Sequence, residues 1–167
     1  IDIINADILK YTIESKYQTV ISNLPYNISS QVLVKFSLLK QIPDQLILMF
    51  QKEFAMRLLN KKINSINSLI NCFYEIKLSF HVSKKCFRPV PKVDSSVLTF
   101  TKKKQPLLNL NEINAFIEFK RTLFSYKRKS LKNLLKKYNL KEKFDLDLRV
   151  EDWDLNTLIS IFRDINL

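Results

Sequence analysis

The stretch QTVISNLPYNISS, residues 18–30, joins the end of an apolar strand to a rigid turn and the start of a helix. Pro25 has no N–H and a fixed φ, so a strand ladder stops at this turn. Beyond it, apolar residues from Val32 to Leu39 recur at helical spacing. The stretch therefore predicts a strand–turn–helix unit that presents the Asn23 amide and the Tyr26 ring at the carboxyl end of the strand.

Further apolar runs extend this unit into an α/β sheet. Strands are expected over residues 1–9, 17–25, 46–50, 75–82 and 95–103, and helices over 29–40, 51–60 and 65–75. The alternation of strand and helix predicts a parallel sheet with right-handed crossovers, and the two late strands predict an antiparallel edge. The continuous run LILMF suits a strand buried on both faces. Ligands of such sheets bind at the carboxyl ends of the strands.

The pattern changes near residue 107, where strand signals end. Residues 107–167 read as helical throughout, and Asp152 or Asp154 can cap the last helix. We therefore expect two domains, an α/β domain over 1–106 and a small helical domain over 107–167.

The charge balance favours a polyanionic partner. Lys and Arg number 28 against 16 Asp and Glu, a formal net charge of +12. Nucleic acid is preferred to a membrane surface, because no basic amphipathic helix with aromatic anchors dominates. A membrane-spanning segment is not expected, since no apolar run reaches about 18 residues. Drift in composition is the alternative reading of the charge.

Most of the excess charge lies between residues 119 and 137, where eight Lys and Arg occur without an acid. Apolar residues such as Phe124 and Leu131 interleave with them, so one helix face can pack while the other stays basic. A basic face of this kind contacts phosphates without reading bases; a merely solvated face is the alternative. The expected RNA-binding residues are Lys120, Arg121, Lys127, Arg128, Lys129 and Lys132.

The Asn-Leu-Pro-Tyr turn suits a planar ring that carries an exocyclic amine. Asn23 and nearby carbonyls can accept both amine hydrogens, and Tyr26 offers a face on which a base can stack. Two acceptors would make the amine nitrogen more tetrahedral and free its lone pair for attack on a methyl sulfonium. The competing interpretation is a strand-ending turn whose Asn caps locally and whose Tyr fills a core.

Other kinds of site find little support. Two cysteines, Cys72 and Cys86, and one histidine are too few for a zinc site, so no metal is expected. The lone His81 lies in an alternating strand and is expected to be structural. None of the 167 residues is glycine, so these residues cannot form a Gly-rich cofactor loop.

Four segments resemble the motifs of the KsgA-type ribosomal RNA adenine dimethylases. In chain order they are NLPYNISSQVL (23–33), FQKEFAMRL (50–58), FRPVPKVDSSV (87–97) and RKSLKNLL (128–135). The resemblance implies the C-terminal part of a Rossmann-like methyltransferase sheet followed by a small all-helical domain. It also implies S-adenosylmethionine as methyl donor and N6,N6-dimethylation of adjacent adenines in small-subunit ribosomal RNA.

The resemblance also implies roles for individual residues. Asn23 and the Pro25 carbonyl would hold the target amine, while Tyr26 would stack on a flipped adenine and Phe87 would cover its other face. Asp7 would contact the adenine amine of the donor. The expected catalytic residues are Asn23, Leu24, Pro25, Tyr26 and Phe87, and the expected cofactor-binding residues are Asp7, Ile8 and Asn23.

The resemblance places a Gly-rich donor loop before residue 1, so the chain is expected to be a fragment. Two other functions stay open: a non-catalytic RNA-binding factor of ribosome assembly, and an Erm-type methylase of large-subunit RNA. The expected partner is small-subunit RNA or its precursor particle, bound by a monomer. The expected location is the cytoplasm, with a mitochondrion or plastid as the alternative.

The missing Gly-rich loop generates the first prediction. The chain by itself should bind S-adenosylmethionine weakly or not at all, because half of the donor pocket lies outside these residues. Isothermal titration calorimetry measures this directly. A dissociation constant below roughly 10 µM, equivalent to about −7 kcal/mol, would contradict the prediction.

Overall fold

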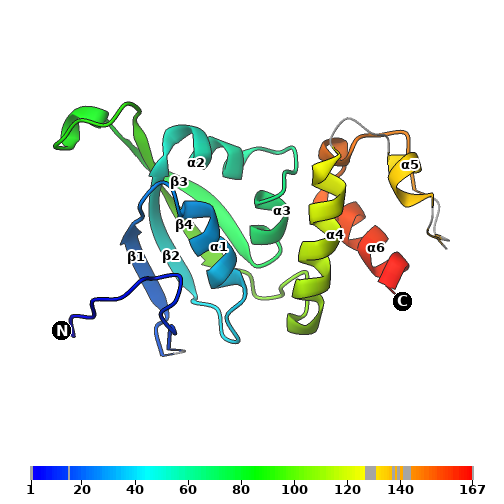
Figure 1. Cartoon of the computed structure of the whole chain (residues 1–167), viewed down its shortest axis with the longest axis horizontal. Helices are drawn as coiled ribbons and strands as arrows, with labels where there is room; N and C mark the ends of the chain where they lie inside the picture. The colour runs from blue at the N-terminus through cyan, green and yellow to red at the C-terminus, as the bar shows by residue number, and fades with distance from the viewer. Residues whose placement is uncertain are drawn as a thin grey trace. The chain divides into compact units, whose positions relative to one another are not determined.

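The computed structural model describes residues 2–14, 16–126, 131–136, 138, 140 and 144–166 (Figure 1). The chain divides into two compact units. Residues Ile1–Leu59 and Tyr74–Lys104 form the first, here the sheet unit, and Asn60–Phe73 with Gln105–Leu167 form the second, here the helical unit. The chain passes between the two units three times, and the last passage, after Lys104, lies close to the expected boundary at 106. Segment 60–73 groups with the helical unit, although it was expected to belong to the α/β domain.

The sheet unit is built on four strands. They are β1 (Thr19–Asn23), β2 (Gln45–Gln51), β3 (Tyr74–Val82) and β4 (Ser95–Lys102). Their order across the sheet is β1-β2-β4-β3. β1 and β2 are parallel, and β4 runs antiparallel to both of its neighbours. The predicted antiparallel pairing of the late strands is confirmed, while parallel pairing is confined to β1 and β2.

One face of the sheet forms the core of this unit. Leu46, Leu48 and Phe50 of β2 are buried there, together with apolar residues of α1 (Ser29–Ser37) and α2 (Lys52–Leu59). The residues between them on β2 are only half-buried, and Ile21 on β1 is 74% exposed. The prediction that LILMF is buried on both faces is therefore wrong, because the described helices of this unit bury only one side.

One expected strand is absent from the described residues, and one expected helix is shorter than predicted. Residues 2–9 form no strand; from Asp7 the chain instead makes a turn in which the Asp7 carbonyl accepts hydrogen bonds from the Lys10 and Tyr11 N–H groups. The helix expected over 65–75 shrinks to α3 (Asn67–Ile70). Its last turns open because Tyr74 already begins β3, where pairing with β4 overrides helix propensity.

The helical unit combines α3 with five later elements. These are η2 (Leu110–Glu112), α4 (Ile113–Ser125), α5 (Leu131–Leu135), η3 (Val150–Asp152) and α6 (Leu155–Asn166). Phe116 of α4 packs edge-on against Phe162 of α6, with ring centroids 5.2 Å apart. Asp154 caps α6 as expected, since its carboxylate accepts the Thr157 N–H at 3.0 Å.

An ion pair reinforces the packing of α6. The Arg163 guanidinium binds both carboxylate oxygens of Glu112, at 2.8 and 3.0 Å, and donates to the Leu107 carbonyl at 2.9 Å. The hydrogen bond from Arg163 is the main cause of the lowered pKa of the Glu112 carboxyl. Such a fork-to-fork pair fixes geometry as well as charge.

Lys120 departs from the expected basic surface. It is only 6% exposed, and its ammonium donates to the carbonyl and the hydroxyl of Ser65 within the helical unit. Burial lowers the pKa of the Lys120 ammonium to about 8, with the charge of Arg121 as a lesser cause. Lys120 therefore joins α4 to segment 60–73, and its ammonium does not lie on the exposed basic surface that the sequence predicted.

This burial predicts a pH dependence of stability. Between about pH 8 and 10.5 the unfolded chain retains a proton that folded Lys120 has lost, so stability should rise with pH. As the pH rises through this range, the free energy of unfolding of wild type should increase relative to that of Lys120→Met, by at most about 1.4 kcal/mol per pH unit.

Urea denaturation followed by Trp153 fluorescence measures the effect, because this buried residue is the only tryptophan and lies in the same unit. Lys136→Met, at an exposed position on the helical unit, serves as the control. A difference between wild type and Lys120→Met that stays constant with pH would contradict the assignment.

Candidate active site

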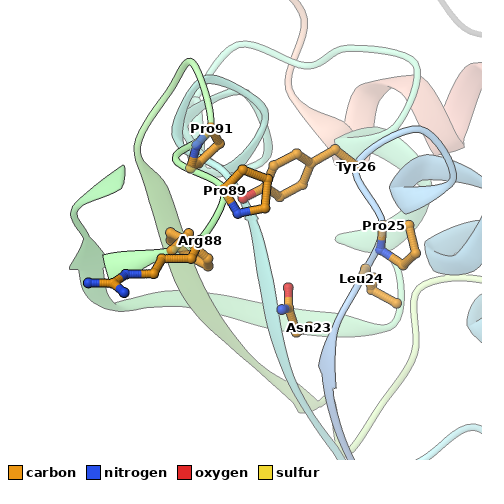
Figure 2. Close-up of a pocket in the computed structure, with 8 residues that line it drawn as sticks. Asn23, Leu24, Pro25, Tyr26, Arg88, Pro89 and Pro91 are labelled. Carbon is orange, nitrogen blue, oxygen red and sulfur yellow. The ribbon is translucent and has the colours of Figure 1, made fainter. Parts of the chain in front are cut away.

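A pocket of about 340 Å³ lies at the carboxyl end of β1 in the sheet unit. Figure 2 shows Asn23 and Tyr26 from the strand end facing the same space as Pro89 from the loop between β3 and β4. The pocket is lined by Asn23, Leu24, Pro25, Tyr26, Phe87, Arg88, Pro89 and Pro91. The structure thus brings together the five residues predicted to be catalytic, from segments more than sixty positions apart.

The turn at Pro25 is held by the start of α1. The Pro25 carbonyl accepts hydrogen bonds from the Ile28 N–H and from the Ser29 hydroxyl, both at 3.2 Å. Serine at a helix start often caps the helix through its side-chain oxygen, but α1 begins after Ile28 without a side-chain cap. Ser29 instead secures the turn, so the two lone pairs of the Pro25 carbonyl are already engaged.

Asn23 and Tyr26 differ in how firmly they are held. Asn23 ends β1 in register with Met49 of β2, and its side chain is exposed at the pocket. The half-buried Tyr26 is fixed by a hydrogen bond of 2.7 Å between its hydroxyl and that of Ser95, the first residue of β4. The pocket therefore presents one solvent-accessible amide beside an aromatic ring of set orientation.

The loop of residues 83–94, between β3 and β4, projects beyond the end of the sheet (Figure 1). Asp94 anchors it at both sides: its carbonyl accepts the Lys52 N–H, and its carboxylate accepts the Lys84 N–H, each at 2.9 Å. Asp94 and Ser95 were not predicted as site residues. The motif FRPVPKVDSSV held the signal, although only the pairing of β4 with β2 shows what they contact.

Of the three residues expected to bind the methyl donor, Asn23 lines this pocket, whereas Asp7 and Ile8 do not. Asp7 is exposed, and one of its carboxylate oxygens accepts the Leu9 N–H at 2.9 Å. The turn that follows is held by Lys35 of α1, whose ammonium donates to the carbonyls of Leu9 and Tyr11 at 3.0 and 2.5 Å. Ile8, beside Asp7, is half-buried.

The other expected RNA-binding residues lie in the helical unit. Arg121 is exposed and pairs with Glu118 at 3.1 Å, and Lys132 is exposed on α5. Lys127, Arg128 and Lys129 lie outside the described residues. Elsewhere, His81 bonds through Nδ1 to the Ser96 hydroxyl at 2.8 Å, in keeping with a structural residue.

No group of three or more potential metal ligands occurs within the part of the chain that the structure describes. The two cysteines form no disulfide within the described residues: the buried Cys72 thiol donates to the Ser68 carbonyl at 3.1 Å, and Cys86 is exposed. Over the same residues, we find no helix with the length and apolarity needed to cross a bilayer.

Comparison with known proteins places this pocket in context. The sequence model described as "Ribosomal RNA adenine dimethylase" matches residues 1–159. The chain is 36% identical to ribosomal RNA small subunit methyltransferase A of Mycoplasma capricolum, covering 97% of this chain and 69% of that protein. It is 40% identical to the protein of the same name from Malacoplasma penetrans, covering 86% of this chain but only 54% of the relative.

The fold has a counterpart of known structure. A crystal structure of a dimethyladenosine transferase from Plasmodium falciparum superposes with a TM-score of 0.84, covering 98% of this chain and 71% of that one at 22% identity. The sheet and its flanking helices therefore have the Rossmann-like fold of such methyltransferases.

The bond between Tyr26 and Ser95 predicts a coupled loss of stability. Tyr26→Phe keeps the ring but leaves the buried Ser95 hydroxyl without this partner, which should cost about 1 kcal/mol of unfolding free energy. Ser95→Ala should cost a similar amount, and the double variant little more than either alone. Urea denaturation followed by circular dichroism measures all three; strictly additive losses would show that the two hydroxyls do not interact.

Proposed function

Because this chain belongs to the ribosomal RNA adenine dimethylase family, we propose that it presents target adenines for N6,N6-dimethylation in small-subunit ribosomal RNA during ribosome assembly. The observation that carries the proposal is the convergence of Asn23, Tyr26 and Phe87 on one pocket. This pocket offers a polar acceptor and aromatic surface, which an unstacked base requires.

The turn would activate the amine by accepting its hydrogens. We assign one acceptor to the Asn23 amide oxygen. The second falls to the Leu24 carbonyl, since the Pro25 carbonyl already receives two hydrogen bonds from the chain. Two accepted hydrogen bonds draw the nitrogen away from conjugation with the ring, so its lone pair can attack. These dipoles also stabilise the positive charge that develops on the nitrogen.

S-adenosylmethionine would supply an electrophilic methyl group bound to a sulfonium. The amine nitrogen would take this methyl group as the S–C bond breaks, and would then release a proton to solvent. The residues at the amino end of the sheet unit fit the adenine of this donor. One oxygen of the exposed Asp7 carboxylate accepts the Leu9 N–H, which leaves acceptor capacity for an exocyclic amine. Ile8 offers apolar surface beside it.

For RNA contacts in the helical unit we propose Arg121 and Lys132 together with Lys127, Arg128 and Lys129. Their charges would hold phosphates and position the particle without reading bases. We further propose that the protein acts as a monomer in the cytoplasm, which agrees with its similarity to bacterial relatives.

Two competing functions make different predictions. A non-catalytic assembly factor would bind small-subunit RNA without transferring methyl groups. An Erm-type enzyme would methylate large-subunit RNA. The identity of 36% and 40% to small subunit methyltransferases favours small-subunit RNA over large-subunit RNA as the target.

The deciding experiment supplies the chain with millimolar labelled S-adenosylmethionine, to offset weak donor binding, and unmethylated small-subunit particles. Mass spectrometry of nuclease digests should detect N6,N6-dimethyladenosine. Asn23→Ala should reduce the rate by about 100-fold or more, as losing one preorganised dipole at a reacting centre does.

Asn27→Ala is the matched control, because this exposed amide lies in the same segment but does not line the pocket. Large-subunit particles form the second arm. Methylation of those particles alone would favour the Erm-type function, and RNA binding without any transfer would favour the assembly factor.

A further inference from the structure

A second groove, of about 540 Å³, lies in the sheet unit beside the loop of residues 83–94. Three lysines line it: Lys52 at the start of α2, and Lys84 and Lys92 on the loop. We name it the lysine groove. None of these three ammonium groups forms an ion pair within the described residues. Unpaired lysines gathered at a hollow surface indicate an anionic ligand.

The acids at the groove do not neutralise it. Glu53 and Asp94 also line it, so three lysines face two acids and the groove keeps a net positive charge. The loop adds two further bases, Lys85 and Arg88. Figure 2 shows the guanidinium of one of them, Arg88, pointing away from Asn23 and Tyr26. The outer side of this loop is therefore basic.

The same loop borders both hollows. Arg88, Pro89 and Pro91 line the pocket at the end of β1, whereas Lys84 and Lys92 line the lysine groove. Pro91 and Lys92 are consecutive residues that serve the two sides. An RNA strand that inserts a base into the pocket can therefore reach the lysine groove by crossing this loop.

The groove also has apolar contact surface. Met56 and Val93 line it and are 37% and 43% exposed. Single-stranded nucleic acid offers ribose and base faces for such contacts beside phosphates for the lysines. An inorganic anion would leave this apolar surface unused.

We propose that the lysine groove binds the RNA backbone next to the target adenine, so that the sheet unit holds its substrate independently of the basic residues of the helical unit. The proposal rests on the proposed function, because it takes RNA as the ligand of the neighbouring pocket. It assigns phosphate contacts to Lys52, Lys84 and Lys92, and sugar or base contacts to Met56 and Val93.

The test compares two triple variants of the full chain with equal loss of charge. The groove variant is Lys52→Gln, Lys84→Gln and Lys92→Gln. The control is Lys40→Gln, Lys103→Gln and Lys104→Gln, three residues of the same unit. Lys40 precedes β2 and the other two follow β4, and because these strands are antiparallel all three lie at the opposite end of the sheet.

Fluorescence anisotropy with a labelled RNA stem-loop, whose loop contains two adjacent adenines, is measured across a salt series. Each phosphate contact contributes about 0.7 to the slope of log K against log salt for single strands, so the groove variant should lose about 2 from the slope relative to the control. Equal slopes for the two variants would overturn the proposal, as would displacement of the RNA by polyglutamate at equal charge, which would indicate an acidic protein ligand.

A second measurement uses the wild-type protein alone, so its result does not depend on whether the variants fold. Bound RNA should protect Lys52, Lys84 and Lys92 from acetylation, as read by mass spectrometry, and leave Lys40, Lys103 and Lys104 reactive. Equal protection of both sets would contradict the groove. Failure of the proposed function is distinguishable, because it would appear as absent methyl transfer while the groove still determined the salt slope.

Discussion

Asp94, which precedes β4, and Ser95, its first residue, hold three parts of the site together. These parts are the start of α2, the loop of residues 83–94 and Tyr26. The Asp94 carbonyl accepts from Lys52 at the start of α2, its carboxylate accepts from Lys84 in the projecting loop, and the Ser95 hydroxyl bonds to Tyr26. Because Ser95 is buried and paired with β2, these contacts are fixed by the sheet. The pocket at the end of β1 and the lysine groove both depend on this point, since each takes a wall from the loop that Asp94 anchors.

The pocket is also shaped by hydrogen bonds that remove candidates. The Pro25 carbonyl looked like an acceptor for a ligand, yet α1 engages it through Ile28 and Ser29. A rigid turn is stable because its polar groups are satisfied, and satisfied groups are no longer available for chemistry. Asn23 differs, because its exposed side chain at the end of β1 points into the pocket.

Charge shows the same dependence on context. The chain carries a formal charge of +12, but its basic residues have separate roles. Lys120 is buried against Ser65, Arg121 pairs with Glu118, and Lys35 holds the turn after Asp7. The lysines at the groove, by contrast, are exposed and form no ion pair within the described residues. A net charge therefore indicates the class of partner, and burial selects the residues that can reach it.

Local patterns predicted much of this molecule, because turn chemistry and periodicity act over a few residues. They located the β1 turn and α1, the hairpin-like late strands and the cap of α6 at Asp154. The motifs named five of the eight residues that line the pocket. They failed where distant contacts compete. Pairing of β3 with β4 shortens the helix expected over 65–75, and the described helices of the sheet unit pack against only one face of β2.

The sequence by itself determined that an Asn-Leu-Pro-Tyr turn ends a strand, and that its chemistry suits an amine on a planar ring. Only the tertiary structure decided which groups are free to act. Pairing of β4 with β2 brings Ser95 to Tyr26 and sets the loop of residues 83–94 beside the pocket, and packing withdraws Lys120 from solvent. These outcomes depend on hydrogen bonds and burial between residues far apart in the chain, which no local pattern specifies.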